Sequence, residues 1–298
     1  MAFRLILTLL LVVLSSVASA RDRIVVVQSG SQPPYEEAVE GFAEVCVQPQ
    51  SRIILSDTNK AVLAGLISRE SPDLILAVGL LDASKALERI HDIPIVYVMV
   101  LDLEGEFADR VNVTGVNMRP SIGVQLQNIR KVLSNIRNVG VVFDPDRNGL
   151  YIQEAVKMAS SLGLEILVEP VTTARVVPSK LLDIRDRVDL IWMIFDATVM
   201  KPQTLEYFIL FSLENRIPLV AFSEKYIQMG AFMAFELDPK DMGRQAGEMA
   251  NQILAGKQPG EIPVQEARTV SVTVNRTVAK KFGIRLDDAL SETVEIVE

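Results

Sequence analysis

The sequence is poor in the two residue types on which many catalytic and metal sites depend. Its 298 residues include one cysteine, Cys46, and one histidine, His91. This excludes an intramolecular disulfide, a cysteine-based metal cluster and a multi-histidine metal centre. A Ser-His-Asp triad would have to be built around His91. We therefore predict no catalytic and no metal-ligating residue, and composition disfavours most hydrolases and metalloenzymes.

A basic excess is also absent, since 30 Lys and Arg residues stand against 38 Asp and Glu residues. Nucleic-acid binding needs a cationic face for the phosphates, so no nucleic-acid partner is expected. Neither a P-loop nor a G-x-G-x-x-G motif follows an apolar run, and no cofactor is expected. The glycines of residues 242–247 fall inside an expected helix, where they indicate close helix packing.

The first twenty residues have the three parts of a secretory signal peptide. Arg4 gives a basic start, residues 5–14 are apolar, and the Ala-Ser-Ala of residues 18–20 forms a small-residue cleavage site. The apolar stretch is shorter than the roughly twenty residues that span a bilayer. We expect cleavage after Ala20 and export to the periplasm. The alternative is a buried N-terminal helix.

Short apolar runs alternate with amphipathic stretches along the rest of the chain. Continuously apolar runs are typical of parallel strands that are covered on both faces, so the sequence predicts an α/β fold with doubly wound parallel sheets. Hydrophobic residues make up 49% of the chain, enough for one large or two medium domains. The expected strands are residues 24–27, 53–55, 74–78, 95–100, 139–143, 164–168, 190–195 and 219–222.

Four landmarks of the first half recur in the same order in the second half, displaced by 115 to 124 residues. The paired segments are 23–28 with 138–143, 37–39 with 154–156, 72–75 with 188–191, and 92–96 with 216–220. A repeat of this kind predicts two similar α/β lobes.

The loops after the strands are the candidate site, because ligands of open α/β sheets bind beyond the carboxyl ends of the strands. Two such edges facing each other would form an interlobe cleft for a small ligand. The predicted ligand-binding residues are Ser29, Ser31, Gln32, Tyr35, Gly79, Leu80, Asp102, Asn148, Asp196, Ala197 and Ser223.

Several of these residues have a second interpretation. Asp196 could accept a hydrogen bond from a ligand ammonium or cap the following helix. Asn148 and Ser223 could contact a ligand or stabilise a turn. Tyr35 and Tyr151 occupy near-equivalent places in the repeat and could stack on a flat ligand or pack at helix starts. The many carboxylates and few cations of these loops favour an amino-bearing or neutral polar solute.

Several motifs, taken in order, carry a family resemblance across essentially the whole mature chain. They are Asn112-Val-Thr-Gly-Val, Gly140-Val-Val-Phe-Asp-Pro, Ile217-Pro-Leu-Val-Ala-Phe-Ser and Asp241-Met-Gly-Arg-Gln-Ala-Gly. Together they resemble the ABC-transporter substrate-binding proteins of the type I periplasmic binding fold, in the branch of tryptophan- and tyrosine-binding proteins. Leu80 and Gly149 depart from the pattern, since relatives carry hydroxyl side chains there that could bond a ligand.

The resemblance implies a clamshell of two lobes that closes on its ligand, with the chain crossing about three times between the lobes. Residues 21–118 plus about 236–267 would form the N-terminal lobe, and about 119–235 plus 268–298 the C-terminal lobe.

The implied function is non-enzymatic: a periplasmic, usually monomeric component of an ABC importer. It would deliver one small organic solute, such as an amino acid or another amino-bearing or aromatic molecule, to a membrane permease driven by a separate ATPase. One alternative is a ligand-sensing module that signals to a membrane receptor kinase. Another is an exported α/β enzyme.

Overall fold

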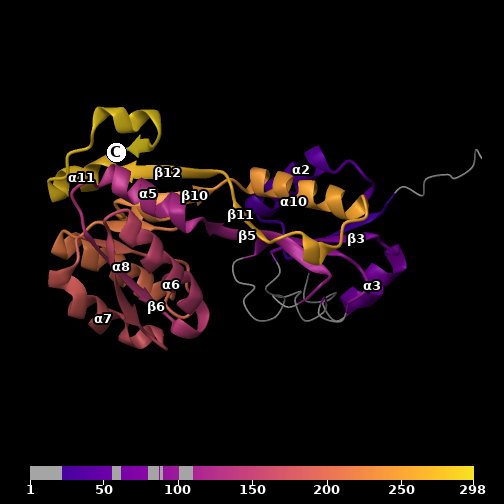
Figure 1. Ribbon diagram of the computed structural model, residues 1–298, viewed down its shortest axis with the longest axis horizontal. Helices are drawn as coiled ribbons and strands as arrows, with labels where there is room; N and C mark the ends of the chain where they lie inside the picture. The colour runs from indigo at the N-terminus through magenta and orange to yellow at the C-terminus, as the bar shows by residue number, and fades with distance from the viewer. Residues whose placement is uncertain (1–21, 56–61, 80–86, 88–89, 101–109) are drawn as a thin grey trace, which may run out of the picture.

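The computed structural model describes residues 22–55, 62–79, 87, 90–100 and 110–298. These residues form two sheets at opposite ends of the molecule, each flanked by helices (Figure 1). The predicted α/β fold with two parallel-dominated sheets is therefore confirmed.

The first sheet is entirely parallel, with the strand order β11-β5-β4-β3-β1-β2. Every residue of its three central strands β1, β3 and β4 is buried, as their unbroken apolar sequences require. Its elements are β1 (Ile24–Gln28), α2 (Pro33–Val45), β2 (Gln50–Ile54), α3 (Leu63–Glu70), β3 (Leu74–Val78), β4 (Ile95–Val100), β5 (Val113–Pro120), α10 (Pro239–Leu254) and β11 (Gln265–Ala267).

The second sheet has the order β13-β12-β10-β9-β8-β6-β7 and is parallel except where β10 meets β12. Its strands are β6 (Asn138–Phe143), β7 (Glu165–Pro170), β8 (Leu190–Trp192), β9 (Leu219–Ala221), β10 (Met233–Leu237), β12 (Val270–Asn275) and β13 (Glu295–Val297). Its helices are α5 (Ile122–Val132), α6 (Pro145–Ser161), α7 (Val177–Ile184), α8 (Pro202–Asn215), α9 (Lys225–Met229) and α11 (Arg276–Phe282).

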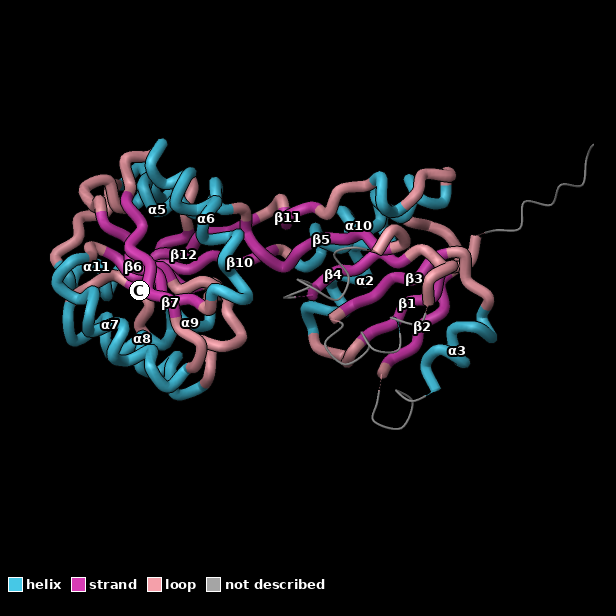
Figure 2. Tube along the Cα trace, turned by 60° about the horizontal axis from the view of Figure 1, so that its bottom comes forward, coloured by secondary structure: helices cyan, strands magenta, loops and turns pink. Residues whose placement is uncertain are grey.

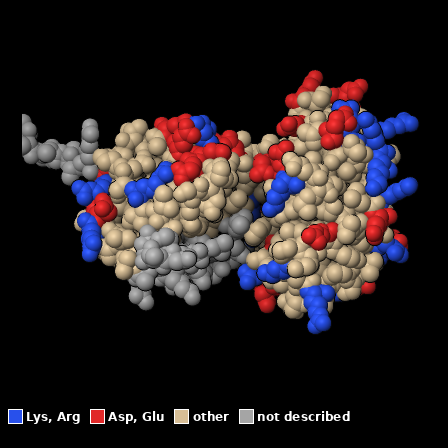
Figure 3. Space-filling view, turned by 180° about the vertical axis from the view of Figure 1, so that it is seen from behind, with Lys and Arg blue, Asp and Glu red and all other residues tan. Residues whose placement is uncertain are grey.

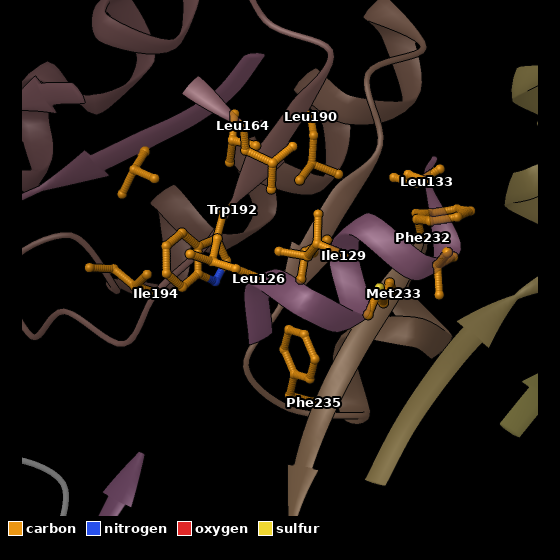
Figure 4. Packing of buried hydrophobic residues seen from close by; sticks show 14 of the residues in the cluster. Leu126, Ile129, Leu133, Leu164, Leu190, Trp192, Ile194, Phe232, Met233 and Phe235 are labelled. Atoms are coloured by element: carbon orange, nitrogen blue, oxygen red, sulfur yellow. The ribbon is translucent and has the colours of Figure 1, made fainter. Parts of the chain in front are cut away.

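The helix starts follow from local side chains. Ser121, Asp144, Asp238 and Asn275 each precede a helix and accept a hydrogen bond from a backbone N–H of its first turn. Such caps satisfy donors that the helix itself leaves unpaired. The apolar face of α5 then packs on the second sheet, where Leu126 and Ile129 belong to one buried cluster with Trp192 (Figure 4).

Five strands of the structure were not predicted from the sequence: β5, β10, β11, β12 and β13. β5 contains Thr114, Gly115, Asn117 and Arg119, so it lacks an unbroken apolar run. β12 alternates apolar and polar residues, which is the pattern of an antiparallel strand. It pairs with β10, and this pairing is antiparallel.

Three segments connect the two sheets. β5 leads into α5, β10 leads into α10, and β11 leads into β12. β5 and β11 pair with each other and run together between the lobes (Figures 1 and 2). The lobes stand as separate masses in the space-filling view (Figure 3). In the part of the chain that the structure describes, no helix is both long and apolar enough to span a membrane.

α10 follows a strand of the second sheet but packs on α2, which covers the first sheet. Glycines make this contact possible. A Cβ on Gly41 would lie 1.9 Å from the Lys240 carbonyl oxygen, and a Cβ on Gly243 would lie 1.9 Å from the Ala38 carbonyl oxygen. The expected role of Gly243 in close helix packing is thus confirmed. Ion pairs of Glu44 with Lys240 and Arg244, both 2.8 Å, flank the contact.

We expect Gly243→Ala to lower the free energy of unfolding by about 1–3 kcal/mol, because the added methyl group forces two helix backbones apart. The matched control is Gly65→Ala in α3, where a Cβ would meet no atom within 4 Å. There, the better helix propensity of alanine should stabilise the protein by up to about 1 kcal/mol. Urea unfolding of both variants checks this, and equal effects at the two positions would contradict the close helix contact.

Candidate functional site

A cavity of about 390 Å³ lies beside the segments that connect the two sheets. This volume is in the range of small-molecule pockets. Both lobes and two of the connecting segments contribute to its wall. The lining residues are Pro34, Met99, Met118, Arg119, Pro120, Gln125, Tyr151, Ile194, Phe195, Met200, Leu205, Phe222, Ser223, Lys225, Tyr226, Glu236, Leu237 and Pro239.

Ser223 is the predicted site residue that lines this cavity. It follows β9, and its Oγ donates a 3.1 Å hydrogen bond to Glu236 Oε2. Glu236 Oε2 also accepts the backbone N–H of Glu224 at 2.7 Å. Ser223 therefore connects the strand-end loop of the second lobe to β10, the strand that leads back to the first lobe.

None of the predicted first-lobe residues that the structure describes lines the cavity, so their contact with a solute stays a prediction. Ser29, Ser31 and Gln32 occupy the segment between β1 and α2, just before the lining residue Pro34. The ring of Tyr35 covers Gly79, since a Cβ there would lie 2.4 Å from Tyr35 Cζ. Gly79 also has φ +67°, which a glycine adopts without strain. Burial raises the pKa of Tyr35, so its phenol stays protonated at neutral pH.

Leu80 and Asp102, two further predicted ligand-binding residues, lie outside the described residues. Their contact with a solute stays a prediction.

Asp196 is buried at the end of the segment that follows β8, and its carboxylate is fully engaged by the protein. Oδ2 accepts the backbone N–H of Asp144 and the Asn148 Nδ2, both at 2.7 Å. Oδ1 accepts the backbone N–H groups of Thr198 at 2.9 Å and Val199 at 3.0 Å. The carboxylate thus joins the segments that follow β6 and β8.

Asn148, next to Asp196, is 1% exposed, and its Oδ1 has no hydrogen-bond partner within the described ranges. Neither residue lines the cavity, nor does Ala197. Contact of these three with a solute stays a prediction.

One wall of the cavity is aromatic. Phe222 lies between Phe195 and Tyr226, with ring centroids 5.5 and 5.1 Å apart and edge-to-face geometry. Such contacts are a favoured arrangement of aromatic rings and hold them in fixed orientations. Met99, Met118 and Met200 also line the cavity with adaptable thioether side chains. The wall suits a flat, largely apolar body.

A second wall is polar and is organised by Gln125 of α5. Its Nε2 donates to the Pro120 carbonyl oxygen and to the Tyr151 hydroxyl oxygen, each at 2.8 Å. Its Oε1 accepts the indole N–H of Trp192 at 3.0 Å. Burial raises the pKa of Tyr151 well above its usual value, so this phenol also remains protonated. Gln125 therefore fixes Tyr151 against the segment that connects β5 to α5.

Two cations and one carboxylate also line the cavity. The Arg119 Cζ lies 5.2 Å from the centroid of the Tyr151 ring, and the Lys225 Nζ lies 4.9 Å from that of the Tyr226 ring. Glu236, on β10, is the carboxylate. The sequence pattern does not indicate Arg119, Gln125 or Glu236, because they lie on connecting segments or helices rather than in the repeated strand-end loops.

Asp241 and Arg268 join two of the connecting segments. Asp241, in the first turn of α10, accepts hydrogen bonds from Arg268 Nη2 at 2.8 Å and Nε at 2.9 Å. It also accepts the Thr269 hydroxyl at 2.6 Å. The neighbouring guanidinium lowers the pKa of Asp241. This forked ion pair attaches the segment between β11 and β12 to α10.

The described residues offer no group of three or more His, Cys, Asp or Glu side chains that could hold a metal ion. Burial raises the pKa of the Cys46 thiol to about 11. At neutral pH it is therefore a protonated thiol, which is a poor nucleophile.

The sequence model of one family, described as "ABC transporter substrate binding protein", matches residues 41–297. This chain belongs to that family. The resemblance drawn from the motifs is thereby confirmed. Members of the family are typically binding proteins without enzymatic activity, and they are typically exported.

A relative within the family is the tyrosine-binding protein of Clostridioides difficile strain R20291. It is 22% identical over 236 residues, which cover 76% of this chain and 68% of the relative.

Two solved structures share the fold. One is the ABC domain from Streptococcus pneumonia in complex with L-Trp, with a TM-score of 0.65 and 19% identity over 93% of this chain and 100% of that chain. The other is the ligand-free, open structure of a substrate binding protein with adhesive properties from Clostridium difficile. Its TM-score is 0.71, with 20% identity over 93% of this chain and 99% of that chain.

We expect Asp196→Ala to lower the free energy of unfolding by at least about 2 kcal/mol, because it leaves buried N–H donors without an acceptor. The control is Asp146→Ala in the first turn of α6, an exposed carboxylate whose loss should cost less than about 1 kcal/mol. Urea unfolding measures both values. If Asp196→Ala left stability unchanged, the hydrogen-bond network would not have the role that we assign to it.

Proposed function

We propose that this protein is the periplasmic solute-binding component of an ABC importer. It binds one small organic solute, an amino acid or a similar amino-bearing or aromatic molecule, in the cavity beside the connecting segments. The observation that carries the proposal is the cavity itself, because residues of both sheets and of two connecting segments form its wall.

The mechanism is hinge closure driven by differential affinity. A solute in the cavity contacts the second lobe through Phe222 and Ser223 and the first lobe through Pro34 and Met99. A closed arrangement gains contacts from both lobes at once, so solute binding favours closure. In this proposal the hinge is at Pro120, Asp238 and Arg268, where the chain passes between the sheets.

The proposed division into lobes follows the sheets except at the last residues of β5 and β10, which extend past its boundaries. Residues 21–118 with about 236–267 form the N-terminal lobe, and about 119–235 with 268–298 form the C-terminal lobe. The positions of β5, β11 and α10 on the first sheet support this division.

The nature of the solute is supported by the cavity wall and by the similar proteins. The rings of Phe195, Phe222 and Tyr226 form a surface on which an aromatic body can pack. Similar proteins are named for tyrosine or were solved with L-Trp. A solute-binding protein of R. palustris with a TM-score of 0.54 and 12% identity was solved with 4-hydroxybenzoate.

The closed, solute-bound protein is proposed to dock as a monomer on a membrane permease that a separate ATPase drives. The alternative is a sensing module that passes its ligand-bound state to a membrane receptor kinase. Capture of a permease by the solute-bound protein from membrane extracts distinguishes the two, and capture of a receptor kinase favours the alternative.

We expect one solute class to raise the melting temperature of the mature protein in a screen of amino acids, aromatic acids, nucleosides, sugars and vitamins. Ligand that binds only the folded state stabilises it by mass action. Phe222→Ala should weaken binding of that class by roughly tenfold or more, because it removes the central ring of the aromatic wall. Leu182→Ala, an exposed position on α7 outside the cavity, is the matched control.

A radius of gyration that decreases on solute addition, measured by small-angle X-ray scattering, would support closure. A folded protein to which no class binds would count against the proposal.

Export is the second expected outcome. The signal peptide lies outside the described residues, and the proposal for it rests on Arg4, the apolar residues 5–14 and the small residues 18–20. N-terminal sequencing of the periplasmic fraction of expressing cells should give a chain that begins at Arg21. A full-length chain retained in the cytoplasm would contradict export.

A further inference from the structure

Arg119 is a half-buried cation on the cavity wall that has no acidic partner. Across residues 22–55, 62–79, 87, 90–100 and 110–298, no carboxylate forms an ion pair with it and no acceptor takes a hydrogen bond from it. Its contact is with the Tyr151 ring, 5.2 Å from its Cζ. A guanidinium has five N–H donors in a planar fork, and in the described residues none of those of Arg119 has an acceptor.

The hydrogen bonds of the cavity wall also leave donors, rather than acceptors, available to a ligand. Tyr151 Oη accepts a hydrogen bond from Gln125, and in the described part of the chain its own proton has no acceptor. Glu236 Oε2, by contrast, already accepts from Ser223 and Glu224. The wall therefore has more unused donors than acceptors.

Local charge is opposite to that of the whole molecule. The chain has a formal net charge of −8, yet two cationic side chains and one carboxylate line the cavity. Lys225 is exposed, whereas Arg119 is half-buried. Charge–charge attraction is stronger away from bulk water, so Arg119 is the better placed of the two to hold an anion.

Resting on the proposed function, we infer that the solute carries a carboxylate and that Arg119 binds it. The guanidinium fork matches the two oxygens of a carboxylate and can bond both at once. The Tyr151 hydroxyl supplies a further donor beside it. Arg119 is thus the residue that determines specificity for an acidic solute.

A single carboxylate fits better than a phosphate or a polyanion. Arg119 is the one half-buried cation among the described lining residues, and Glu236 on the same wall repels additional negative charge. The aromatic wall at Phe222 takes the apolar body. An aromatic monocarboxylate meets both requirements, with or without an ammonium group.

The position of Arg119 also connects binding to the hinge. Arg119 belongs to β5 of the first sheet, and Tyr151 belongs to α6 of the second lobe. A carboxylate bound to both side chains would connect the end of β5, a strand of the first sheet, to α6, a helix that packs on the second sheet. The next residue, Pro120, is held by Gln125 through its carbonyl oxygen, so the binding group lies at the start of the segment that connects the lobes.

The test compares acids with counterparts that lack the carboxylate. L-tyrosine, L-tryptophan and 4-hydroxybenzoate are titrated by calorimetry against tyramine, tryptamine and 4-hydroxybenzamide. We expect binding of at least one acid and a Kd about 10- to 100-fold weaker for its counterpart, because a charged hydrogen-bonded group is lost.

The variants then assign the effect to one residue. Arg119→Gln should weaken acid binding by the same factor and abolish the preference over the counterpart. Arg119→Lys should restore part of that preference, since it keeps the charge but loses the fork. Lys157→Met, which removes an exposed cation from the same helix as Tyr151 but outside the cavity, is the charge-matched control.

The outcomes separate this inference from the proposed function. If tyramine or tryptamine binds as tightly as its acid, or if Arg119→Gln retains the preference, the inference is wrong and the proposed function stands. If none of the six compounds binds, the inference is also wrong, and the wider solute screen then decides the proposed function. If Arg119→Gln does not fold, the comparison of acids with their counterparts on the natural sequence still decides the inference.

Discussion

The two-lobed arrangement depends on the contact between α2 and α10. Gly41 and Gly243 allow these helix backbones to approach more closely than any side chain would permit. Because α10 continues from a strand of the second sheet, the contact fixes one connecting segment to the first lobe. The fork of Arg268 on Asp241 then attaches another connecting segment to the same helix. Two of the three connecting segments are thus anchored to the first lobe through the same helix, α10.

Both helices of the α2–α10 contact begin at the cavity, since Pro34 of α2 and Pro239 of α10 line it. The cavity lies beside the segments that connect the two sheets. Part of its wall therefore comes from these segments rather than from the loops after the strands. Gln125 binds a hinge carbonyl, the indole of Trp192 and the phenol of Tyr151 at the same time. In the proposed function, solute recognition and hinge movement would therefore share these side chains.

The sequence predicted those parts of the fold that depend on local pattern. The unbroken apolar runs of β1, β3 and β4 correspond to strands buried on both faces, and the internal repeat corresponds to two sheets of the same kind. β5 and β12 were missed because each mixes polar with apolar residues. Arg119 and Glu236 were missed for a related reason, because they lie on the connecting strands β5 and β10. A sequence pattern does not show whether a charged side chain on such a strand finds a partner elsewhere in the fold. The pattern alone could not decide between the two interpretations of Asp196, because two of its four donors, on Asp144 and Asn148, come from a segment about fifty residues away.

The position of Trp192 allows tryptophan fluorescence to report on the cavity wall. Trp192 is the single tryptophan of the chain, and its indole N–H is bonded to the amide that also holds Tyr151 in the cavity wall. Its ring lies 6.2 Å from that of Tyr151. A movement of the Tyr151 phenol or of the Pro120 carbonyl should change the polarity around the Trp192 indole through Gln125. No second tryptophan contributes to the signal. The molecule therefore carries an intrinsic fluorophore in the core of its second lobe, one hydrogen bond away from the cavity wall, and solute binding in the proposed site should change its emission spectrum without a label.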